Sequence, residues 1–261
     1  MTDWRFLVRQ TSLIWENTMD LSEAEKVIIG IPFDSTATGL SGAKLGPDRI
    51  REEFRLWAPS YDSSLGSLEN VKVYDVGNVE TIPGDPKETS RRIYSVVSGI
   101  LGENPNVKII ILGGEHSITY PVVKALADSG KGFDYLCFDA HLDLLDSYLG
   151  LKESHASVNR RVSEIVGPDH MEIRGARIGE KEEWELARKL GSAKDPVYLS
   201  IDLDVLEGVP TGTPVPDGWT FTRLWNEIKD REWVAVDIVE YNPMLGVSPV
   251  PSELLRRFLL H

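Results

Sequence analysis

Hydrophobic residues recur along the chain in short uninterrupted runs that are rich in valine and isoleucine. The clearest runs cover residues 27–31, 71–74, 107–112, 135–138, 197–201 and 234–239, and a weaker run covers residues 171–178. Apolar runs of this length are typical of strands that are buried on both faces, as in a parallel sheet. The pattern therefore predicts a buried, mostly parallel sheet at the centre of the fold.

Between the runs, apolar residues recur every three or four positions, which is the spacing of an amphipathic helix. The best example is residues 87–101, and similar segments cover Pro47 to Phe54, residues 117–127 and residues 181–190. Because strand and helix alternate, we expect an α/β fold with three layers, α/β/α, around the central sheet. No linker-like or low-complexity segment interrupts the alternation, so residues 1–261 are expected to form a single domain.

Polar residues with metal-binding chemistry directly follow four of the apolar runs. These stretches read GGEHS at 113–117, DAHLD at 139–143, DLD at 202–204 and EYN at 240–242. In a parallel sheet, binding sites form in the crevice at the carboxyl ends of the strands. We therefore expect the four stretches to meet at one edge of the sheet.

Metal-binding side chains occupy every second position in two of these stretches: Asp, His and Asp in 139–143, and two Asp in 202–204. Residues two apart on an extended strand point the same way, so each stretch directs its side chains toward one point. The candidate metal ligands are His116, Asp139, His141, Asp143, Asp202 and Asp204. Four carboxylates in one place would repel one another without cations. A set rich in oxygen and free of thiolate favours two Mn²⁺ ions, with Co²⁺ or Fe²⁺ as alternatives.

The chain is acidic, with 41 Asp and Glu against 28 Lys and Arg and a net charge of −13. This balance argues against a nucleic-acid partner and suits a small cationic substrate, although an acidic surface also aids solubility. The single cysteine, Cys137, lies in an apolar run and is expected to be a buried thiol. No signal-peptide pattern and no apolar segment of about 18 residues is present, so we expect no membrane partner and a cytoplasmic location.

Taken together, the stretches at 113–117, 139–143 and 200–204 resemble the three metal-binding motifs of the ureohydrolases, the arginase/agmatinase family. GIPFD at 30–34 with GAKLGP at 42–47 is similar to the N-terminal part of that family, and VDIVEYNP at 236–243 is similar to its late strand. The resemblance runs from about residue 27 to about residue 243. It implies an arginase-like fold and a homo-oligomer, either a trimer or a hexamer.

The resemblance also implies the reaction and its metal ligands. A hydroxide that bridges two Mn²⁺ ions attacks the carbon of a guanidinium group and releases urea and an amine. Asp139 and Asp202 would bridge both ions. His116 and Asp143 would complete one ion's set of ligands, and His141 and Asp204 would complete the other ion's set.

The resemblance to the family also implies roles for other residues. Glu240 would pair with the guanidinium of the substrate, because a planar cation matches a carboxylate fork. Asp143 would accept a hydrogen bond from the hydroxide. His155, in the stretch SHA at 154–156, would transfer a proton to the leaving amine. Glu115 is expected to orient the neighbouring His116.

The residues after Asp143 bear on the choice of substrate. Leu144 and Leu145 follow it, whereas arginases carry an Asn two residues on that holds the substrate's carboxylate. Lys152 is the one cation in the nearby loop that could replace that contact. Agmatine has no carboxylate and is dicationic, so we favour an agmatinase-like hydrolase of linear amidines. Arginase, guanidinobutyrase and formimidoylglutamase activities are the alternatives.

Two further departures concern the pocket rather than the ligands. Glu207 and Gly208 stand where the family has an Asp-Pro pair, in a loop that is shorter, and no acidic residue follows Pro243.

Two other classes of protein are alternatives to a ureohydrolase. A metallophosphatase or metal-dependent deacetylase fits poorly, because GGEHS does not match the Gly-Asn-His pattern of phosphatases. A catalytically inactive family member with a regulatory or structural role would be expected to lack a ligand, and none is lacking.

Overall fold

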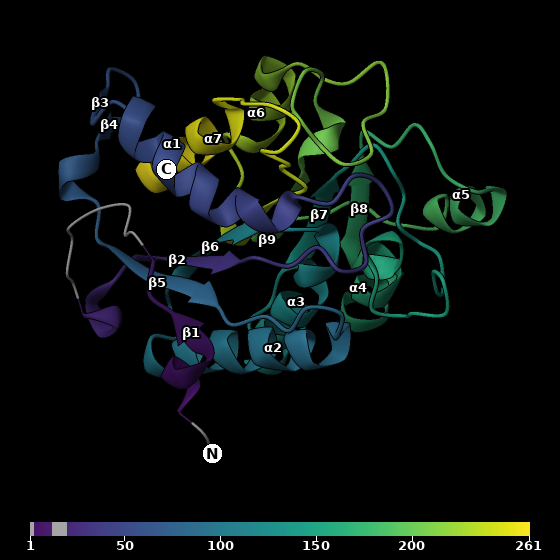
Figure 1. Ribbon diagram of the computed structural model, residues 1–261, viewed down its shortest axis with the longest axis horizontal. Coiled ribbons are helices and arrows are strands. Elements are labelled where there is room, and N and C mark those ends of the chain that lie inside the picture. Colours follow the sequence, from purple (N-terminus) through teal and green to yellow (C-terminus); the bar gives the residue numbers. More distant parts are fainter. Residues whose placement is uncertain (1–2, 12–19) are drawn as a thin grey trace.

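An eight-stranded sheet forms the middle of the computed structural model, which describes residues 3–11 and 20–261 (Figure 1). In spatial order the strands are β1 (Val8–Arg9), β5 (Val73–Val79), β2 (Lys26–Ile31), β6 (Lys108–Gly113), β10 (Trp233–Val239), β9 (Val197–Asp202), β7 (Asp134–Phe138) and β8 (Met171–Arg174). All neighbouring pairs are parallel except β1 with β5, which is antiparallel. A separate two-stranded hairpin consists of β3 (Tyr61–Asp62) and β4 (Gly66–Ser67).

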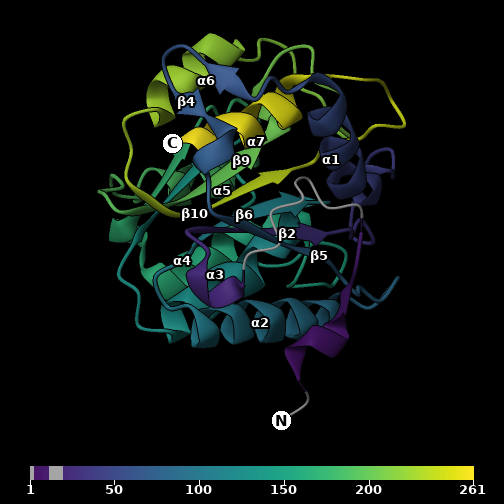
Figure 2. The same ribbon diagram turned by 90° about the vertical axis from the view of Figure 1, so that its left-hand side faces the viewer.

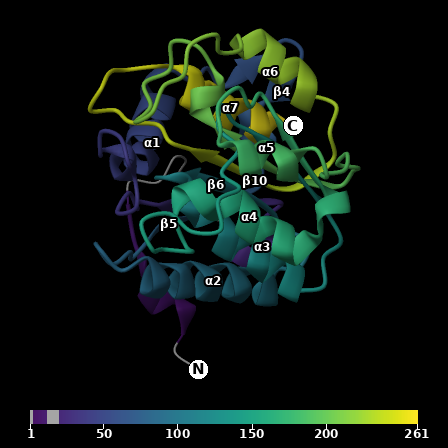
Figure 3. The ribbon, with the colours of Figure 1, turned by 90° about the vertical axis from the view of Figure 1, so that its right-hand side faces the viewer.

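Helices cover both faces of the sheet and complete the three layers that the sequence predicts (Figures 2 and 3). One face carries α2 (Pro86–Glu103), α3 (Thr119–Asp128) and α4 (Val158–Val166), with α5 (Lys181–Ala187) at the side, and the other carries α1 (Gly46–Trp57), α6 (Phe221–Ile228) and α7 (Val250–Leu260). The 3₁₀ turns are η1 (Trp4–Leu7), η2 (Leu21–Glu23), η3 (Ala43–Leu45), η4 (Leu68–Asn70), η5 (His116–Ile118), η6 (His155–Ser157), η7 (Pro168–His170) and η8 (Leu203–Val205).

Alternate side chains of each central strand enter one of two hydrophobic cores. On β6, Ile109 and Ile111 pack in the core under α2 and α3, whereas Ile110 and Leu112 pack in the core under α1 and α7. All four side chains are fully buried. Burying an aliphatic side chain of this size contributes about 1.5–3 kcal/mol, so continuous apolar strands are the natural solution for a sheet covered on both sides.

The predicted strands are confirmed, but two have other bounds than expected. The run at 71–74 becomes β5, which begins at Val73 and continues to Val79. The weak run at 171–178 forms a strand only as far as Arg174, because Gly175 turns the chain with a φ of +95°. The segment predicted as a helix from residue 117 begins with the 3₁₀ turn η5, and α3 starts at Thr119. Helices α4, α6 and α7 were not predicted. Among the described residues, no helix is both long and apolar enough to cross a membrane.

Strand order positions the polar stretches. Strands β6, β10, β9 and β7 are consecutive neighbours and run parallel, so their carboxyl ends lie at one edge of the sheet. The four polar stretches singled out in the sequence follow these four strands and no others. The expectation that they meet at one edge is therefore confirmed.

Candidate metal centre

The six candidate ligands converge at that edge. His116 begins η5 directly after β6, three candidates follow β7, Asp202 ends β9 and Asp204 lies in η8. Five of the six are at most 9% exposed, and only His141 is partly open to solvent. Carboxylates and imidazoles from three separate strand ends thus share one buried site.

Three carboxylates surround one ring nitrogen of His116. Its Nδ1 lies 3.2 Å from Asp139 Oδ2, 3.2 Å from Asp143 Oδ2 and 3.4 Å from Asp202 Oδ2. The other nitrogen, Nε2, lies 2.9 Å from Ser200 Oγ, which in turn donates to Asp237. Because the Ser200 hydroxyl donates to Asp237, it accepts from Nε2–H. A neutral His116 therefore turns its Nδ1 lone pair toward the carboxylates, as a metal ligand does.

A second group of candidate ligands surrounds His141. Its Nδ1 lies 2.7 Å from Asp204 Oδ2 and 3.6 Å from Asp139 Oδ1, so Asp139 contacts both histidines. Backbone N–H groups hold the carboxylates in place: Ala140 donates to Asp204 at 2.9 Å, and His141 donates to Asp139 at 2.6 Å. Asp139 thus lies between two groups of ligands, where a bridging residue is expected.

Burial and mutual repulsion dominate the electrostatics of the cluster. Burial, together with neighbouring carboxylates, raises the pKa of Asp202 well above its ordinary value. The same causes raise the pKa of Asp143 to about 7 and that of Glu240 to about 8. Carboxylates buried side by side are costly to ionise unless positive charge compensates them. Positive charge placed among these carboxylates would oppose the shifts.

The residues present fit divalent cations. Asp139 Oδ2 is buried and accepts no hydrogen bond within the described part of the chain. A buried carboxylate oxygen without a donor is costly, and a bound cation would satisfy it. Hard carboxylate oxygens with two imidazoles are ligands that suit Mn²⁺ and related ions.

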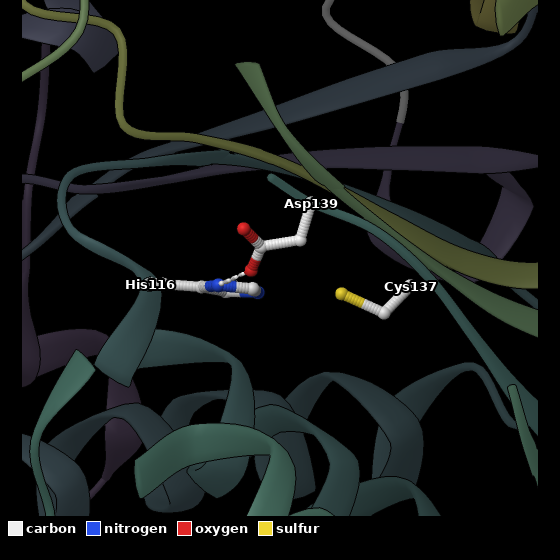
Figure 4. Close-up of side chains that lie close together, drawn as sticks. All are labelled: His116, Cys137 and Asp139. Atoms are coloured by element: carbon white, nitrogen blue, oxygen red, sulfur yellow. Dashed lines mark ion pairs between the residues drawn. The ribbon is translucent and has the colours of Figure 1, made fainter. Parts of the chain in front are cut away.

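Cys137 lies beside this centre, with its sulfur close to His116 and Asp139. Its sulfur and the Asp139 carboxylate both point toward the His116 ring (Figure 4), and Cys137 is fully buried, as expected. Burial raises the pKa of its thiol to about 11, so in the absence of a bound cation the thiol stays protonated at neutral pH.

A pocket of about 260 Å³ opens beside the cluster. Its lining includes Thr38, Leu145, Tyr148, His155, Ile178, Glu180, Glu183, Thr213 and Glu240, with His141, Asp143, Asp202 and Asp204 at the cluster. Among the described residues that line it, none is Lys or Arg. Lys152, the one candidate partner for a substrate carboxylate, lies outside the lining and is 3.8 Å from Asp146 Oδ2.

His155 borders the pocket and is held by two threonines. Its Nε2 lies 2.8 Å from Thr38 Oγ1, and its Nδ1 lies 3.4 Å from Thr36 Oγ1. The ring of Tyr148 meets it edge-on, with centroids 5.5 Å apart. Burial lowers the pKa of the His155 imidazole to about 4. The neutral ring is therefore the favoured form.

Glu240 enters the pocket from a strained backbone. Its φ is +66°, an uncommon conformation for a residue with a side chain, and its N–H donates to Gly114 O at 2.8 Å. Asp143 has a φ of +51° as well. Left-handed backbone at non-glycine residues costs about 1–3 kcal/mol and tends to cluster at functional sites.

The predicted role of Glu115 is wrong. Its carboxylate does not contact the His116 ring but accepts hydrogen bonds from Thr36 and Ser117. Sequence reasoning also missed Thr36, Thr38 and Tyr148 as neighbours of His155. Thr36 and Thr38 lie in the polar loop after β2, and the position of this loop over β6 depends on tertiary packing that no local pattern encodes.

Comparisons with known proteins agree with this geometry. A sequence model of the arginase family matches residues 24–193 and 186–259 of the chain. The chain is 36% identical over 242 residues to the N(1)-aminopropylagmatine ureohydrolase of Thermococcus kodakarensis, covering 82% of this chain and 80% of that protein. It is also 36% identical over 242 residues to an agmatinase of Pyrococcus horikoshii, covering 83% and 81%. The crystal structure of agmatine ureohydrolase of Thermoplasma volcanium superposes with a TM-score of 0.85 at 31% identity, covering 96% of this chain and 94% of that one.

Proposed function

The chain belongs to the arginase family, and on that premise we propose that it hydrolyses agmatine to urea and a diamine with the help of two Mn²⁺ ions. At the coarser level, the protein is a hydrolase that acts on C–N bonds of linear amidines. The substrate, the metal and the roles of individual residues form the proposal.

Six residues would hold the metal ions. They are His116, Asp139, His141, Asp143, Asp202 and Asp204. When bound, such ions supply hydroxide near neutral pH, because they lower the pKa of coordinated water. The support for this assignment is the convergence of these side chains on His116 and His141, together with the unsatisfied buried oxygen of Asp139.

The observation that carries the choice of agmatine is the lining of the pocket. Acidic side chains such as Glu180, Glu183 and Glu240 line it, and none of its described residues is Lys or Arg. Arginine would bring a carboxylate into this acidic lining without a cationic partner, which is costly. Agmatine carries two positive charges and no carboxylate, so it complements the lining.

Glu240 would bind the guanidinium of the substrate. Its Oε1 accepts a hydrogen bond of 2.9 Å from the His116 backbone N–H, which holds the carboxyl group in one orientation. A guanidinium donates in a planar fork that matches a carboxylate held in this way. The substrate's charge would also keep Glu240 ionised, in opposition to the burial that raises its pKa.

His155 would transfer the proton that the leaving amine needs. Its ring borders the pocket, and a neutral imidazole keeps a lone pair on one nitrogen that can take up a proton and return it. We expect His155→Ala to slow turnover by about 100-fold while the metal content stays the same. Loss of metal in that variant would instead indicate that His155 is a ligand.

A urea-release assay with a panel of substrates tests the proposal. Protein loaded with Mn²⁺ is given agmatine, arginine, N1-aminopropylagmatine and 4-guanidinobutyrate at equal concentrations, with formimidoylglutamate followed by formamide release. We expect the highest kcat/KM for agmatine. A clear preference for another compound would contradict the choice of agmatine, and no turnover of any compound by metal-loaded protein would favour an inactive family member. The proposal includes a homo-oligomer in the cytoplasm, for which sedimentation and cell fractionation are the measurements.

A further inference from the structure

A chain of hydrogen bonds leads from a buried carboxylate to the ring of His155. Glu115 is fully buried, and its Oε2 accepts from the Thr36 backbone N–H at 2.8 Å. Its Oε1 accepts from the Thr36 hydroxyl at 2.5 Å and from the Ser117 hydroxyl at 2.6 Å. Thr36, itself 8% exposed, then contacts His155 twice. Glu115 and His155 are thus connected through a single threonine.

The position of one hydrogen decides what Thr36 can offer to His155. A threonine hydroxyl has one hydrogen to donate and two lone pairs that accept. The hydrogen of Thr36 is directed to Glu115, so both contacts with His155 must be ones in which Thr36 accepts. One comes from the His155 backbone N–H at 3.1 Å, and the other involves ring Nδ1 at 3.4 Å. The second contact requires a proton on Nδ1.

The opposite ring nitrogen faces a different environment. Nε2 lies 2.8 Å from the hydroxyl of Thr38, an exposed residue that lines the pocket. A neutral imidazole with its proton on Nδ1 has its lone pair on Nε2, where Thr38 can donate to it. The two threonines thus give the two nitrogens opposite roles.

We propose that Thr36 is a positioning residue that fixes the tautomer of His155, with the proton on Nδ1 and the lone pair of Nε2 directed toward Thr38 and the pocket. The inference rests on the proposed role of His155 in the hydrolysis. In that role Nε2 takes up the proton that the attacking water loses and gives it to the leaving amine, so the ring returns to the same neutral tautomer after each turnover. Glu115 acts on His155 only indirectly, because it orients the Thr36 hydroxyl.

Three single substitutions separate this role from a general effect on Glu115. Thr36→Val removes the hydroxyl with little change in shape, and Thr36→Ser keeps it. Ser117→Ala removes another donor to the same Glu115 oxygen, at a residue that, among the described hydrogen bonds, makes none to His155. We expect Thr36→Val to lower kcat by about 10-fold, the loss of one hydrogen bond, with KM and metal content unchanged. Thr36→Ser and Ser117→Ala should each stay within about threefold of wild type. Equal losses in Thr36→Val and Ser117→Ala would overturn the proposal.

A double-mutant cycle tests whether Thr36 acts through His155. In a His155→Ala background, Thr36→Val should cause no further loss of kcat, because the ring that it orients is absent. A second loss of about 10-fold, additive with the first, would contradict the proposed link.

Neutron diffraction from crystals of the metal-loaded wild type reads the tautomer directly and needs no variant and no turnover. We expect deuterium on Nδ1 of His155 and none on Nε2. Deuterium on Nε2 alone, or on both nitrogens, would overturn the proposal even if agmatine is hydrolysed. If the substrate panel releases no product, the proposed function fails, while the neutron map still decides the tautomer.

Discussion

The backbone N–H of His116 donates a hydrogen bond of 2.9 Å to the Oε1 atom of Glu240. The two residues are 124 positions apart in sequence, and the bond joins the ends of the neighbouring parallel strands β6 and β10. It fixes the Glu240 carboxyl relative to a candidate metal ligand. The proposed partner of the guanidinium and the proposed metal centre therefore keep a constant separation, which a reaction at the guanidinium carbon requires.

Glu240→Gln tests this relationship. The amide oxygen can keep the hydrogen bond to His116, but the negative charge that would pair with the guanidinium is lost. We expect kcat/KM for agmatine to fall by about 100-fold or more, the typical loss when a charged partner of the reacting group is removed. The matched control is Glu232→Gln, at an exposed carboxylate just before β10 and at the opposite end of that strand from Glu240, which should keep wild-type kcat/KM.

The same variant is expected to change stability in a defined direction. The pKa of Glu240 is raised from 4.5 to about 8, mainly by burial, so between these pH values the folded state binds more protons than the unfolded state. The free energy of unfolding contributed by Glu240 then falls as pH rises from about 4.5 to about 8. In metal-free protein, Glu240→Gln should lack this decline and be more stable than wild type at pH 8. Denaturant titrations across this pH range measure the difference.

Asp139→Ala is predicted to abolish the rise in Tm that Mn²⁺ causes. Asp139 contacts both histidines of the cluster, so its loss should affect both groups of ligands. Excess Mn²⁺ should raise the Tm of the wild type by about 5 °C or more through mass action, and a chelator should reverse this. The variant should fold, show no such shift and lose about 1000-fold or more in activity. Calorimetry with and without Mn²⁺ measures this, and Asp169→Ala, at an exposed carboxylate, is the control.

Arg51 should be essential for stability rather than for chemistry. It is 1% exposed, and its Nε and Nη2 donate to the two oxygens of Asp75 at 2.8 Å, while Nη1 donates to Asn78 at 2.7 Å. Removing one partner of a buried ion pair leaves a charge without compensation. Arg51→Met should therefore lower the free energy of unfolding by about 3–5 kcal/mol in urea titrations. Arg55→Met, on the exposed face of α1, should change it by less than about 0.5 kcal/mol.

Lys26 gives the protein a rise in stability at alkaline pH. Burial, with the nearby charge of Lys108, lowers its pKa from 10.5 to about 8, and its Nζ donates to Leu259 O at 2.7 Å. Between these pH values the unfolded state holds a proton that the folded state has released, so this contribution to the free energy of unfolding increases with pH. The increase is on the order of 2–3 kcal/mol across this range.

Urea titrations at pH 8 and pH 10.5 compare wild type with Lys26→Met. The wild type should gain stability relative to the variant over this interval. Lys181→Met, at a side chain that is 90% exposed, is the control and should follow the wild type. A parallel change in wild type and Lys26→Met would refute the assignment.

The sequence predicted the sheet well because its strands are buried on both faces, so that hydrophobicity alone identifies them. Helices α4, α6 and α7 were not predicted. α4 and α6 each bury only two apolar residues, which is too few to define a helical period in the sequence. In α7, Leu254, Leu255, Phe258 and Leu259 do have helical spacing, so this helix could have been predicted. Boundaries such as the end of β8 at Arg174 depend on a single glycine turn.

The candidate site was predictable where each residue follows its own strand. His116, Asp139 and Asp202 are placed by local sequence and strand order, so their convergence followed from the parallel sheet. Contacts across the pocket were not predictable in this way. Thr36 and His155 are 119 residues apart and meet only because the loop after β2 packs over β6.

The carboxylate cluster sits on strand ends, whereas Thr38, Tyr148, Ile178 and Glu180 reach the pocket from loops or from the residues just before α5. Replacing or shortening these loops can alter which substrate fits the pocket without displacing the strands that carry the carboxylate cluster. A scaffold divided in this way lends itself to rapid divergence in substrate range, and grafting the loops of one relative onto another offers a direct route to redesigned selectivity.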